Sequence, residues 1–307
     1  MKTRPIRVIR VLFRSLRRPR LNYYNTRMTP GPGDTLRIHD RPVLDRATLV
    51  LAFSGWMDGG DVSTGTVRRL VDLLGAKSIA EIDPEPYYLY NFPGPMELAA
   101  LFRPHLKIEG GKVLSFDMPA NTFYCHEPAN LVLFLGKEPN LRWRTFGDAI
   151  LELAGQVGIR RVLFVGSFGG SVPHTREPRL YATCSDPAQL PEMERYGVRP
   201  TAYEGPGSFT SYLLTRAPAA GLEMTSLVAE IPGYLQGRNP MSIEAVTRRL
   251  AKILRLPLDL GALRTESTEW ELEVSRAVER DRDLTKTVRR LEEAYDNELL
   301  QQEADEA

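Results

Sequence analysis

Hydrophobic and polar positions alternate in two ways between about residue 34 and residue 265. Short apolar runs, typical of strands that are buried on both faces, are followed by segments in which apolar residues recur every three or four positions, as in helices. The clearest apolar run is Val162-Leu163-Phe164-Val165. This alternation predicts an α/β fold with a mostly parallel sheet and helices on its faces.

The first predicted unit is a strand at 48–53, a loop at 54–61 and a helix with an apolar stripe at Val67, Leu70, Val71 and Leu74. A second helix is expected near 145–157. Further strands are expected at 77–82, 112–116, 131–135, 161–165 and 224–229.

The chain from Ser267 onward has a helical pattern without strands. Its apolar positions follow a four-three spacing that includes one charged residue. The positions are Trp270, Val274, Ala277, Asp281, Leu284, Val288, Leu291 and Tyr295. A charged helix with so narrow a seam buries little surface alone, so it should pack on the core, on itself as a hairpin, or on another chain.

Charge divides the 307 residues into three parts, although the net charge is only +1. Residues 1–33 carry nine Lys or Arg and no acid, whereas residues 266–307 carry 14 Asp or Glu against six Lys or Arg. We therefore expect a basic arm at 1–33, an α/β core at 34–265 and a charged helical segment at 266–307. The two ends could attract each other within one chain or between subunits.

The basic arm predicts an amphipathic helix that ends at Pro19. Apolar residues lie on one face, and arginines lie on the other. Such a helix suits an anionic membrane or nucleic acid, which would bind through residues 1–20, or a targeting segment. The alternatives are an unstructured arm, or an upstream extension with the functional start at Met28.

Several classes of protein are disfavoured by what the chain lacks. No apolar run approaches the ~18 residues of a spanning helix, and no secretory signal is evident, so a cytoplasmic location is expected. Cys125 and Cys184 show no C-x-x-C spacing, and the side chains of Cys125-His126-Glu127 could not all point at one ion. Neither a metal nor a cofactor is expected.

Candidate chemistry should lie in the loops that follow strands, because open α/β sheets bind ligands outside the carboxyl ends of their strands. The first such loop, Ser54 to Asp61, contains Gly55, Gly59 and Gly60 before a helix start, where free N–H groups could hold an anion. The alternative is a sharp glycine turn whose helix is capped by Asp61 or Ser63.

The second loop leads from Gly166 into His174, Thr175 and Arg176. The imidazole could be a general base, and the guanidinium could bind a carboxylate or phosphate in bidentate fashion. The structural alternative is a hydrogen-bonded His174 and an Arg176 that pairs with a surface acid such as Glu177.

The third loop region supplies one carboxylate, Glu204, and aromatic rings that include Tyr234. Together with the histidine and the glycine loop, these groups would suffice for a nucleoside-cleaving or phosphorolytic enzyme. They do not define a mechanism.

Four segments together resemble the proteasome assembly chaperone 2 family, in its bacterial branch that is labelled ATP-grasp-like. The resemblance extends from about Arg37 to Leu263 and is specific as a set. The segments are Phe53-Ser54-Gly55-Trp56-Met57-Asp58-Gly59-Gly60, Val172-Pro173-His174-Thr175-Arg176, Tyr203-Glu204-Gly205-Pro206 and Ile231-Pro232-Gly233-Tyr234.

This resemblance implies a three-layer α/β/α sandwich akin to nucleoside phosphorylases, and homo-oligomers such as trimers. It favours a non-enzymatic protein-binding or assembly factor; the alternative is an enzyme or sensor for a nucleoside or an anionic metabolite. The candidate ligand-binding residues are Ser54, Gly55, Trp56, Asp58, Gly59, Gly60, His174, Thr175, Arg176, Glu204 and Tyr234.

Overall fold

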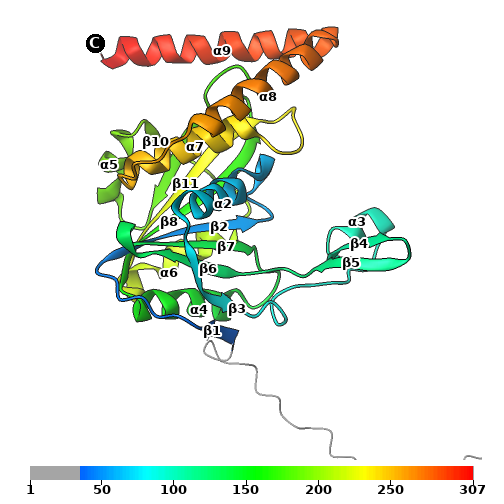
Figure 1. Cartoon of the computed structure of the whole chain (residues 1–307). Coiled ribbons are helices and arrows are strands. Elements are labelled where there is room, and N and C mark those ends of the chain that lie inside the picture. The colour runs from blue at the N-terminus through cyan, green and yellow to red at the C-terminus, as the bar shows by residue number, and fades with distance from the viewer. Residues whose placement is uncertain (1–34, 307) are drawn as a thin grey trace, which may run out of the picture. The chain divides into compact units, whose positions relative to one another are not determined.

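The computed structural model describes residues 35–306, and in this part of the chain nine strands form one sheet (Figure 1). The four central strands, β7, β2, β8 and β11, are parallel, and antiparallel pairs join them on both flanks, so the sheet is mixed. In sheet order the strands are β1 (Leu36–Ile38), β3 (Lys77–Ile82), β6 (Thr122–His126), β7 (Leu131–Lys137), β2 (Ala47–Ser54), β8 (Ile159–Gly170), β11 (Glu223–Pro232), β9 (Arg179–Cys184) and β10 (Val198–Pro200).

The central strands form where the sequence has its continuous apolar runs. In β2, Leu49 lies opposite Val132 of β7 on one side and Val162 of β8 on the other, and Leu49 and Val132 are fully buried. The predicted strands at 48–53, 77–82, 131–135, 161–165 and 224–229 are confirmed. The short flanking strands β1, β6, β9 and β10 were not predicted, because they lack such runs.

Helices cover both faces of the sheet (Figure 1). On one face, α4 (Trp143–Gln156) and α6 (Phe209–Arg216) bury Phe146 and Phe209 against the strands. On the other face, α2 (Val62–Leu74) and α7 (Pro240–Ile253) contribute to a second cluster of buried aliphatic side chains. A short helix, α5 (Leu190–Glu194), precedes β10.

A hairpin arm departs from the main sheet between β3 and β6. It contains α3 (Met96–Ala100) and a two-stranded sheet of β4 (His105–Glu109) and β5 (Lys112–Asp117). The strand predicted at 112–116 therefore exists, but its placement with the main sheet was wrong. Gly110 and Gly111 both have positive φ angles, 56° and 77°, and this turn pairs β5 with its neighbour β4 (Figure 1).

The C-terminal pattern forms two helices, α8 (Gly261–Glu279) and α9 (Arg282–Glu306). The predicted helical pattern is interrupted at Asp281, its one charged apolar-stripe position. The Asp281 carboxylate accepts hydrogen bonds from the N–H groups of Asp283 and Leu284 at 2.9 and 3.0 Å. This residue begins α9 as a cap. Of the three expected packing modes, contact with the chain's own core is observed, since α8 packs along α7.

The predicted basic helix of residues 1–20 and the alternative start at Met28 lie outside the described residues. Within residues 35–306, no helix has the length and apolarity needed to span a bilayer. The division into three parts at 33/34 and 265/266 stays a prediction, and the second boundary falls inside α8.

We expect Phe146→Ala to lower the free energy of unfolding by about 3–5 kcal/mol, because this fully buried ring packs within 4.8–6.5 Å of four other aromatic rings. Phe146→Leu preserves more volume and should cost less than half as much. Urea denaturation monitored by circular dichroism measures both. Equal losses for the two variants would contradict this packing role.

Candidate functional site

Except for Glu204, which follows β10, the candidate residues lie at or just after the carboxyl ends of β2, β8 and β11. Because β2, β7, β8 and β11 are parallel, these ends share one edge of the sheet. The loop after β2 reaches β8, where Asp58 bridges to Ser167 and the Ser167 hydroxyl donates to the Gly59 carbonyl at 2.7 Å. It also reaches the start of α7, because the Asn239 N–H donates to the Gly60 carbonyl at 2.8 Å.

Asp58 caps the helix that follows this loop. Its carboxylate accepts from the Thr64 N–H at 3.0 Å and from the Thr64 hydroxyl at 2.7 Å. Asp61 occupies the predicted N-cap position of α2, but its side chain makes no capping hydrogen bond, and the prediction of Ser63 as the cap was wrong; a 3₁₀ turn at Gly59–Asp61 places Asp58 over the first turn of α2. The Ser63 hydroxyl instead accepts from the Phe53 N–H of β2 and donates to the Val165 carbonyl of β8.

Gly60 is required at its position for two reasons. Its φ angle is 65°, a conformation that residues with a side chain rarely adopt. A Cβ at this position would also lie 2.8 Å from the Asn239 Cβ. The structure therefore supports the interpretation of this loop as a sharp turn that requires glycine.

Glu138, which the sequence analysis missed, fixes the other side of the same loop. One carboxylate oxygen accepts from the Trp56 N–H at 3.2 Å, and the other accepts from the Phe209 N–H of α6 at 2.8 Å. Its position directly after β7, at the same edge of the sheet, was the signal that could have identified it.

His174 is 1% exposed and is held on both ring nitrogens. Nδ1 lies 2.6 Å from the Tyr234 hydroxyl, which also accepts from the His174 N–H at 2.8 Å, and Nε2 lies 3.1 Å from the Ser275 hydroxyl of α8. Burial lowers the pKa of His174, and Glu292 opposes this effect. The two candidate residues His174 and Tyr234 are thus in direct contact beneath α8.

Arg176 forms a bidentate ion pair with Asp296 of α9, with both N–O distances at 2.8 Å. The adjacent Thr175 hydroxyl donates to Glu292 of the same helix at 2.5 Å. The alternative that Arg176 pairs with a surface acid is therefore confirmed, but the acid is Asp296 and not Glu177, which pairs with Arg248 at 2.5 Å. The Arg176 hydrogen bond lowers the pKa of the Asp296 carboxyl.

The structure divides the candidate residues into separate groups. Within residues 35–306, no hydrogen bond or ion pair joins the loop at 54–60 to the group formed by His174, Thr175, Arg176 and Tyr234. Glu204 is exposed, and its side chain contacts no hydrogen-bonding partner in the described chain.

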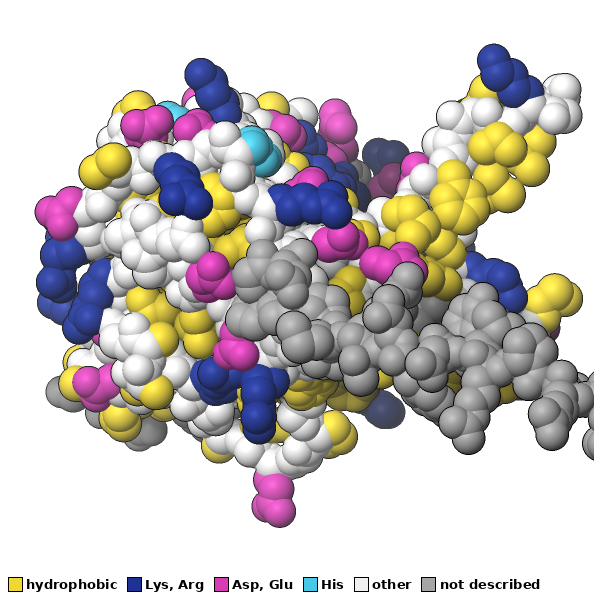
Figure 2. Space-filling view, turned by 90° about the horizontal axis from the view of Figure 1, so that it is seen from below, with side chains coloured by type: hydrophobic (Ala, Val, Ile, Leu, Met, Phe, Trp, Pro, Cys, Tyr) yellow, Lys and Arg dark blue, Asp and Glu magenta, His cyan; other side chains and the backbone are white. Residues whose placement is uncertain are grey.

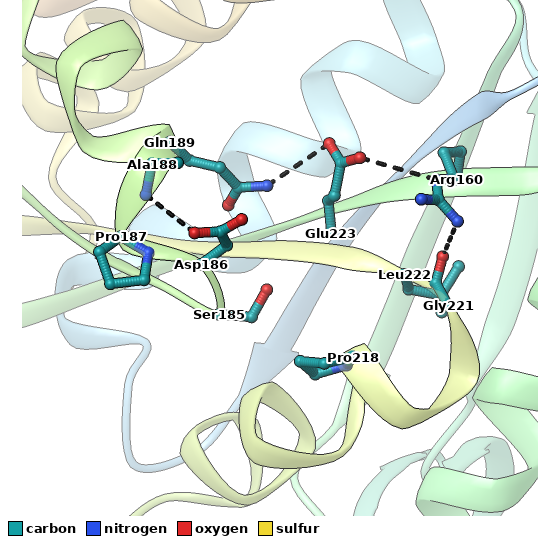
Figure 3. A pocket seen from close by; sticks show the side chains of 10 residues that line it. All are labelled: Arg160, Ser185, Asp186, Pro187, Ala188, Gln189, Pro218, Gly221, Leu222 and Glu223. Atoms are coloured by element: carbon teal, nitrogen blue, oxygen red, sulfur yellow. Dashed lines mark hydrogen bonds and ion pairs between the residues drawn. The ribbon is translucent and has the colours of Figure 1, made fainter.

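Two pockets of the described chain are lined by residues outside the candidate set. The first, of about 610 Å³, lies at the opposite edge of the sheet, near Arg160 and Glu223 at the starts of β8 and β11 (Figure 3). The second, of about 590 Å³, lies beside α9 and includes Arg179, Arg199 and Arg249. The described residues also contain no group of three or more potential metal ligands.

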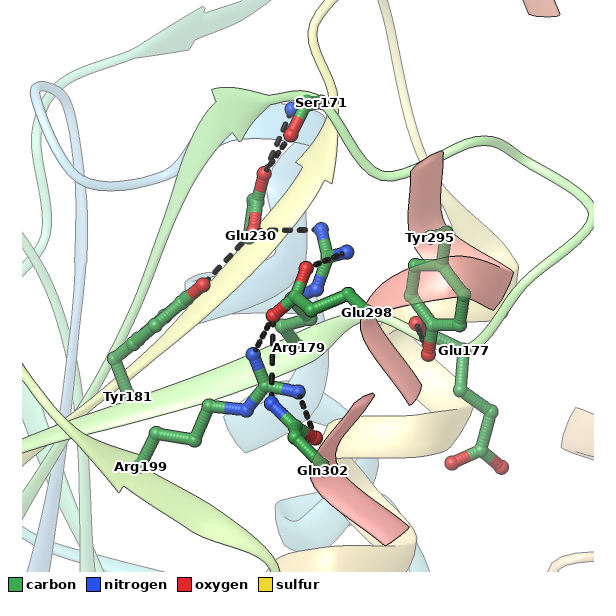
Figure 4. Close-up of polar contacts among 9 residues, drawn as sticks. All are labelled: Ser171, Glu177, Arg179, Tyr181, Arg199, Glu230, Tyr295, Glu298 and Gln302. Carbon is green, nitrogen blue, oxygen red and sulfur yellow. Dashed lines mark hydrogen bonds and ion pairs between the residues drawn. The ribbon is translucent and has the colours of Figure 1, made fainter. Parts of the chain in front are cut away.

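A buried carboxylate, Glu230 of β11, forms a second polar group that the sequence analysis missed (Figure 4). It accepts from the Ser171 N–H at 2.7 Å, from the Tyr181 hydroxyl at 3.1 Å and from the Arg179 guanidinium at 3.5 Å. The sequence analysis did not single out Glu230, because it is one polar position in a strand of mostly apolar residues.

Arg179 connects this buried carboxylate to α9. Its guanidinium donates to Glu298 at 2.5 Å and lies 4.4 Å from the centre of the Tyr295 ring. Arg199 of β10 pairs with the same Glu298. Three arginines, Arg176, Arg179 and Arg199, therefore hold one face of α9 through its carboxylates; we call these contacts the arginine clamp.

Comparison with known proteins gives a consistent result. A model described as the PAC2 family matches residues 52–278. Rv2125, a Mycobacterium tuberculosis proteasome-assembly chaperone homologue, is 29% identical over 78% of this chain and 99% of its own, with a TM-score of 0.67. A search of curated proteins found no match.

Two further crystal structures are similar. A PAC2 family protein from Streptomyces avermitilis is 27% identical, with a TM-score of 0.66, over 79% of this chain and 99% of its own. Rv2714, an M. tuberculosis protein of unknown function, is 23% identical over 90% of this chain and 94% of its own, with a TM-score of 0.78, which shows a shared fold.

The pKa of Asp58 predicts a pH-dependent stability. Burial raises this pKa from 3.8 to about 6, and the bonds from Thr64 oppose the rise. As the pH rises, Asp58 therefore loses its proton in the unfolded chain before it does so in the folded chain. The stabilising contribution of protonated Asp58 is complete below pH 3.8 and is lost as the pH rises through about 6.

Asp58→Asn keeps an acceptor for the Thr64 N–H but does not titrate. Relative to this variant, the wild type should lose about 2 kcal/mol of unfolding free energy between pH 4 and pH 7, with little further change above that range. Urea denaturation at a series of pH values measures the difference. A difference that is constant across this range would contradict the assignment.

The arginine clamp predicts that α9 is held by charge. Asp296→Asn should increase amide exchange across 282–306 severalfold, and about 1 M salt should do the same to the wild type, because it screens exposed charges beyond ~3 Å. Asp283→Asn is the matched control, since that carboxylate is 97% exposed and contacts only Lys286 as an ion pair in the described chain. Unchanged exchange in Asp296→Asn would contradict the clamp.

Proposed function

This chain belongs to the PAC2 family, and from that premise we propose that it is a proteasome-assembly-chaperone-like factor that binds proteins and catalyses no reaction. One observation carries the proposal. The candidate groups with useful chemistry, Asp58, His174 and Arg176, all serve internal contacts that hold loops and helices in place.

Exposed aromatic side chains support a protein-binding surface at the carboxyl edge of the sheet. Trp56, in the loop after β2, is 64% exposed, and Phe168, near the carboxyl end of β8, is 40% exposed. Large aromatic residues contribute much of the binding energy at protein interfaces because they bury a large area with few rotatable bonds. The backbone under Trp56 is fixed by Glu138, so this ring is presented by an ordered loop.

The partner class follows from the relatives. Rv2125 is described as a proteasome-assembly chaperone homologue, so we propose unassembled proteasome subunits as partners of this chain. We further propose a cytoplasmic location and self-association, with the trimer that the family resemblance implies. Kinship of the fold with nucleoside phosphorylases, the three-layer sandwich and the ATP-grasp label also remain proposals, as does binding of an anionic ligand by the loop Ser54–Gly60.

Binding to purified proteasome subunits from the source organism tests the proposal. We expect the full chain to co-migrate with unassembled subunits in native gels and size-exclusion chromatography. Trp56→Ala and Phe168→Ala should each weaken this binding by about tenfold or more, as at interface hot spots. Val43→Ala is the matched control, because that side chain is 96% exposed but lies away from the carboxyl edge.

Two outcomes would contradict the proposal. One is the absence of binding to any proteasome subunit at micromolar concentration. The other is a dose-dependent rise in the melting temperature with nucleosides, nucleotides or phosphate, because a native-state ligand stabilises the fold by mass action, by roughly 2.7 kcal/mol at 100 times Kd.

A further inference from the structure

The pocket beside α9 contains an arginine that the arginine clamp does not use. Arg249 of α7 lines this pocket together with Arg179 and Arg199, which both pair with Glu298. Among the residues whose side chains are described, none forms a hydrogen bond or ion pair with the Arg249 side chain, and its Nε is buried. One of the three guanidinium groups in the pocket is therefore available to a ligand.

The charge of Arg249 lacks a partner although the side chain is partly buried. Burial lowers the pKa of Arg249, the Glu177 carboxylate opposes this effect, and the Arg248 charge adds to it. Glu177 forms its own ion pair with Arg248. Because a partly buried cation without a carboxylate costs folding free energy, an external carboxylate that pairs with Arg249 would remove this cost.

Gly197, in the turn before β10, makes room for the Arg249 guanidinium at the wall of the pocket. A Cβ at this position would lie 2.9 Å from Nη1 of Arg249. The φ angle of Gly197 is also 69°, which residues with a side chain rarely adopt. Any other residue would displace the guanidinium or strain the turn.

The walls of the pocket combine cations with apolar groups. The volume of about 590 Å³ lies within the range of roughly 300–1,000 Å³ that is usual for ligand sites. A ligand that fills it would carry apolar groups beside its anionic one. The apolar wall is formed by Pro178, Leu180, Val198, Pro200, Tyr295 and Leu299.

The helix α9 shows which chemistry these arginines recognise. The Glu298 carboxylate pairs with Arg199 and, at 2.5 Å, with Arg179 (Figure 4). On the same helix, the Tyr295 ring lies 4.4 Å from the Arg179 guanidinium, and Leu299 lines the pocket. A polypeptide segment therefore already binds here through a carboxylate that is flanked by apolar side chains.

We infer that this pocket binds an acidic segment of a partner protein, with one carboxylate of the segment on Arg249 and its apolar side chains against the pocket wall. A guanidinium can offer two parallel N–H groups to a carboxylate, as Arg176 does to Asp296. The helix α9 stays in place, because Arg249 does not hold it. The inference rests on the proposed function for the kind of partner, and it adds a contact apart from the exposed aromatic side chains.

Fluorescence anisotropy of the full chain with two labelled six-residue peptides tests the inference. One peptide alternates glutamate and leucine, and the other has glutamine in place of each glutamate. At about 50 mM salt, the acidic peptide should bind at least about tenfold more tightly, because charge-assisted hydrogen bonds are stronger than neutral ones. Arg249→Gln should abolish this difference.

Arg68→Gln is the matched control, because it removes the same charge from an exposed arginine of α2 that does not line the pocket. It should change the affinity by less than about twofold, since salt screens distant charges. Both variants keep the hairpin arm, along which exposed hydrophobic side chains gather in Figure 2. Any binding of leucine side chains to the arm would therefore be the same in both.

The stability of Arg249→Gln provides a second readout. Its melting temperature should equal or exceed that of the wild type, because the substitution removes a partly buried charge without leaving a partner unpaired. A clearly lower melting temperature would assign Arg249 a structural role and overturn the inference.

The peptide measurements can overturn the inference in two further ways. One is equal affinity for the acidic and the neutral peptide, or for the wild type and Arg249→Gln. The other is competition by free phosphate or glutarate at the concentrations at which the peptide binds, which would assign the pocket to small anions. Tight binding of the acidic peptide alone, lost in Arg249→Gln and kept in Arg68→Gln, supports the inference.

Binding of proteasome subunits separates this inference from the proposed function. Subunits that bind Arg249→Gln as tightly as the wild type, but bind Trp56→Ala weakly, overturn the inference alone. A wild type that binds the acidic peptide through Arg249 but binds no subunit overturns the proposed function and supports the acid-binding pocket.

Discussion

The four central parallel strands have no face that can be left in water. Residues such as Val50 and Leu51 point to opposite sides of β2, and both are fully buried. Helices must therefore cover both faces, and the connections that return the chain must run between the two edges of the sheet. This requirement places the loops after β2, β7, β8 and β11 together at one edge, where the candidate groups lie.

Ion pairs, in contrast to the apolar core, hold the C-terminal helix α9 in place. Among the residues of α9 whose side chains are described, the buried hydrophobic ones are Val288 and Tyr295, too few to fix a helix of 25 residues by burial alone. Carboxylates of α9 instead meet three arginines that β9, β10 and the loop after β8 supply. Glu230 of the central strand β11 also pairs with one of these arginines, Arg179, so the arginine clamp is connected to the core of the sheet.

Five of the nine strands of the main sheet, β2, β3, β7, β8 and β11, could be predicted from the local pattern of apolar residues, whereas the short strands β1, β6, β9 and β10 lack such a pattern. The helix α2 and its glycine loop were also evident, since glycines and a stripe such as Val67 and Leu70 are properties of a short segment. The polar contacts were not, because they join residues far apart in the sequence. Glu138 is 71 residues from Phe209, and Arg176 is 120 residues from Asp296.

The same reason explains the error at residues 112–116. Local pattern identified a strand there, but only a tertiary contact determines which sheet a strand joins. The candidate residues could be selected from the sequence because the family resemblance is carried by short segments. Whether Arg176 is free or paired depends on a helix more than 100 residues later.

The arginine clamp sets a threshold for anything else that would bind those guanidinium groups. Because Asp296 and Glu298 belong to the same chain, they compete as intramolecular ligands whose effective concentration is on the order of millimolar. If the clamp opens in about one molecule in a hundred, an external anion binds about a hundredfold more weakly than the arginines alone would allow. Free phosphate and small anionic metabolites at ordinary cellular levels would then not bind these arginines. A surface that carries several acidic groups would be needed to displace α9.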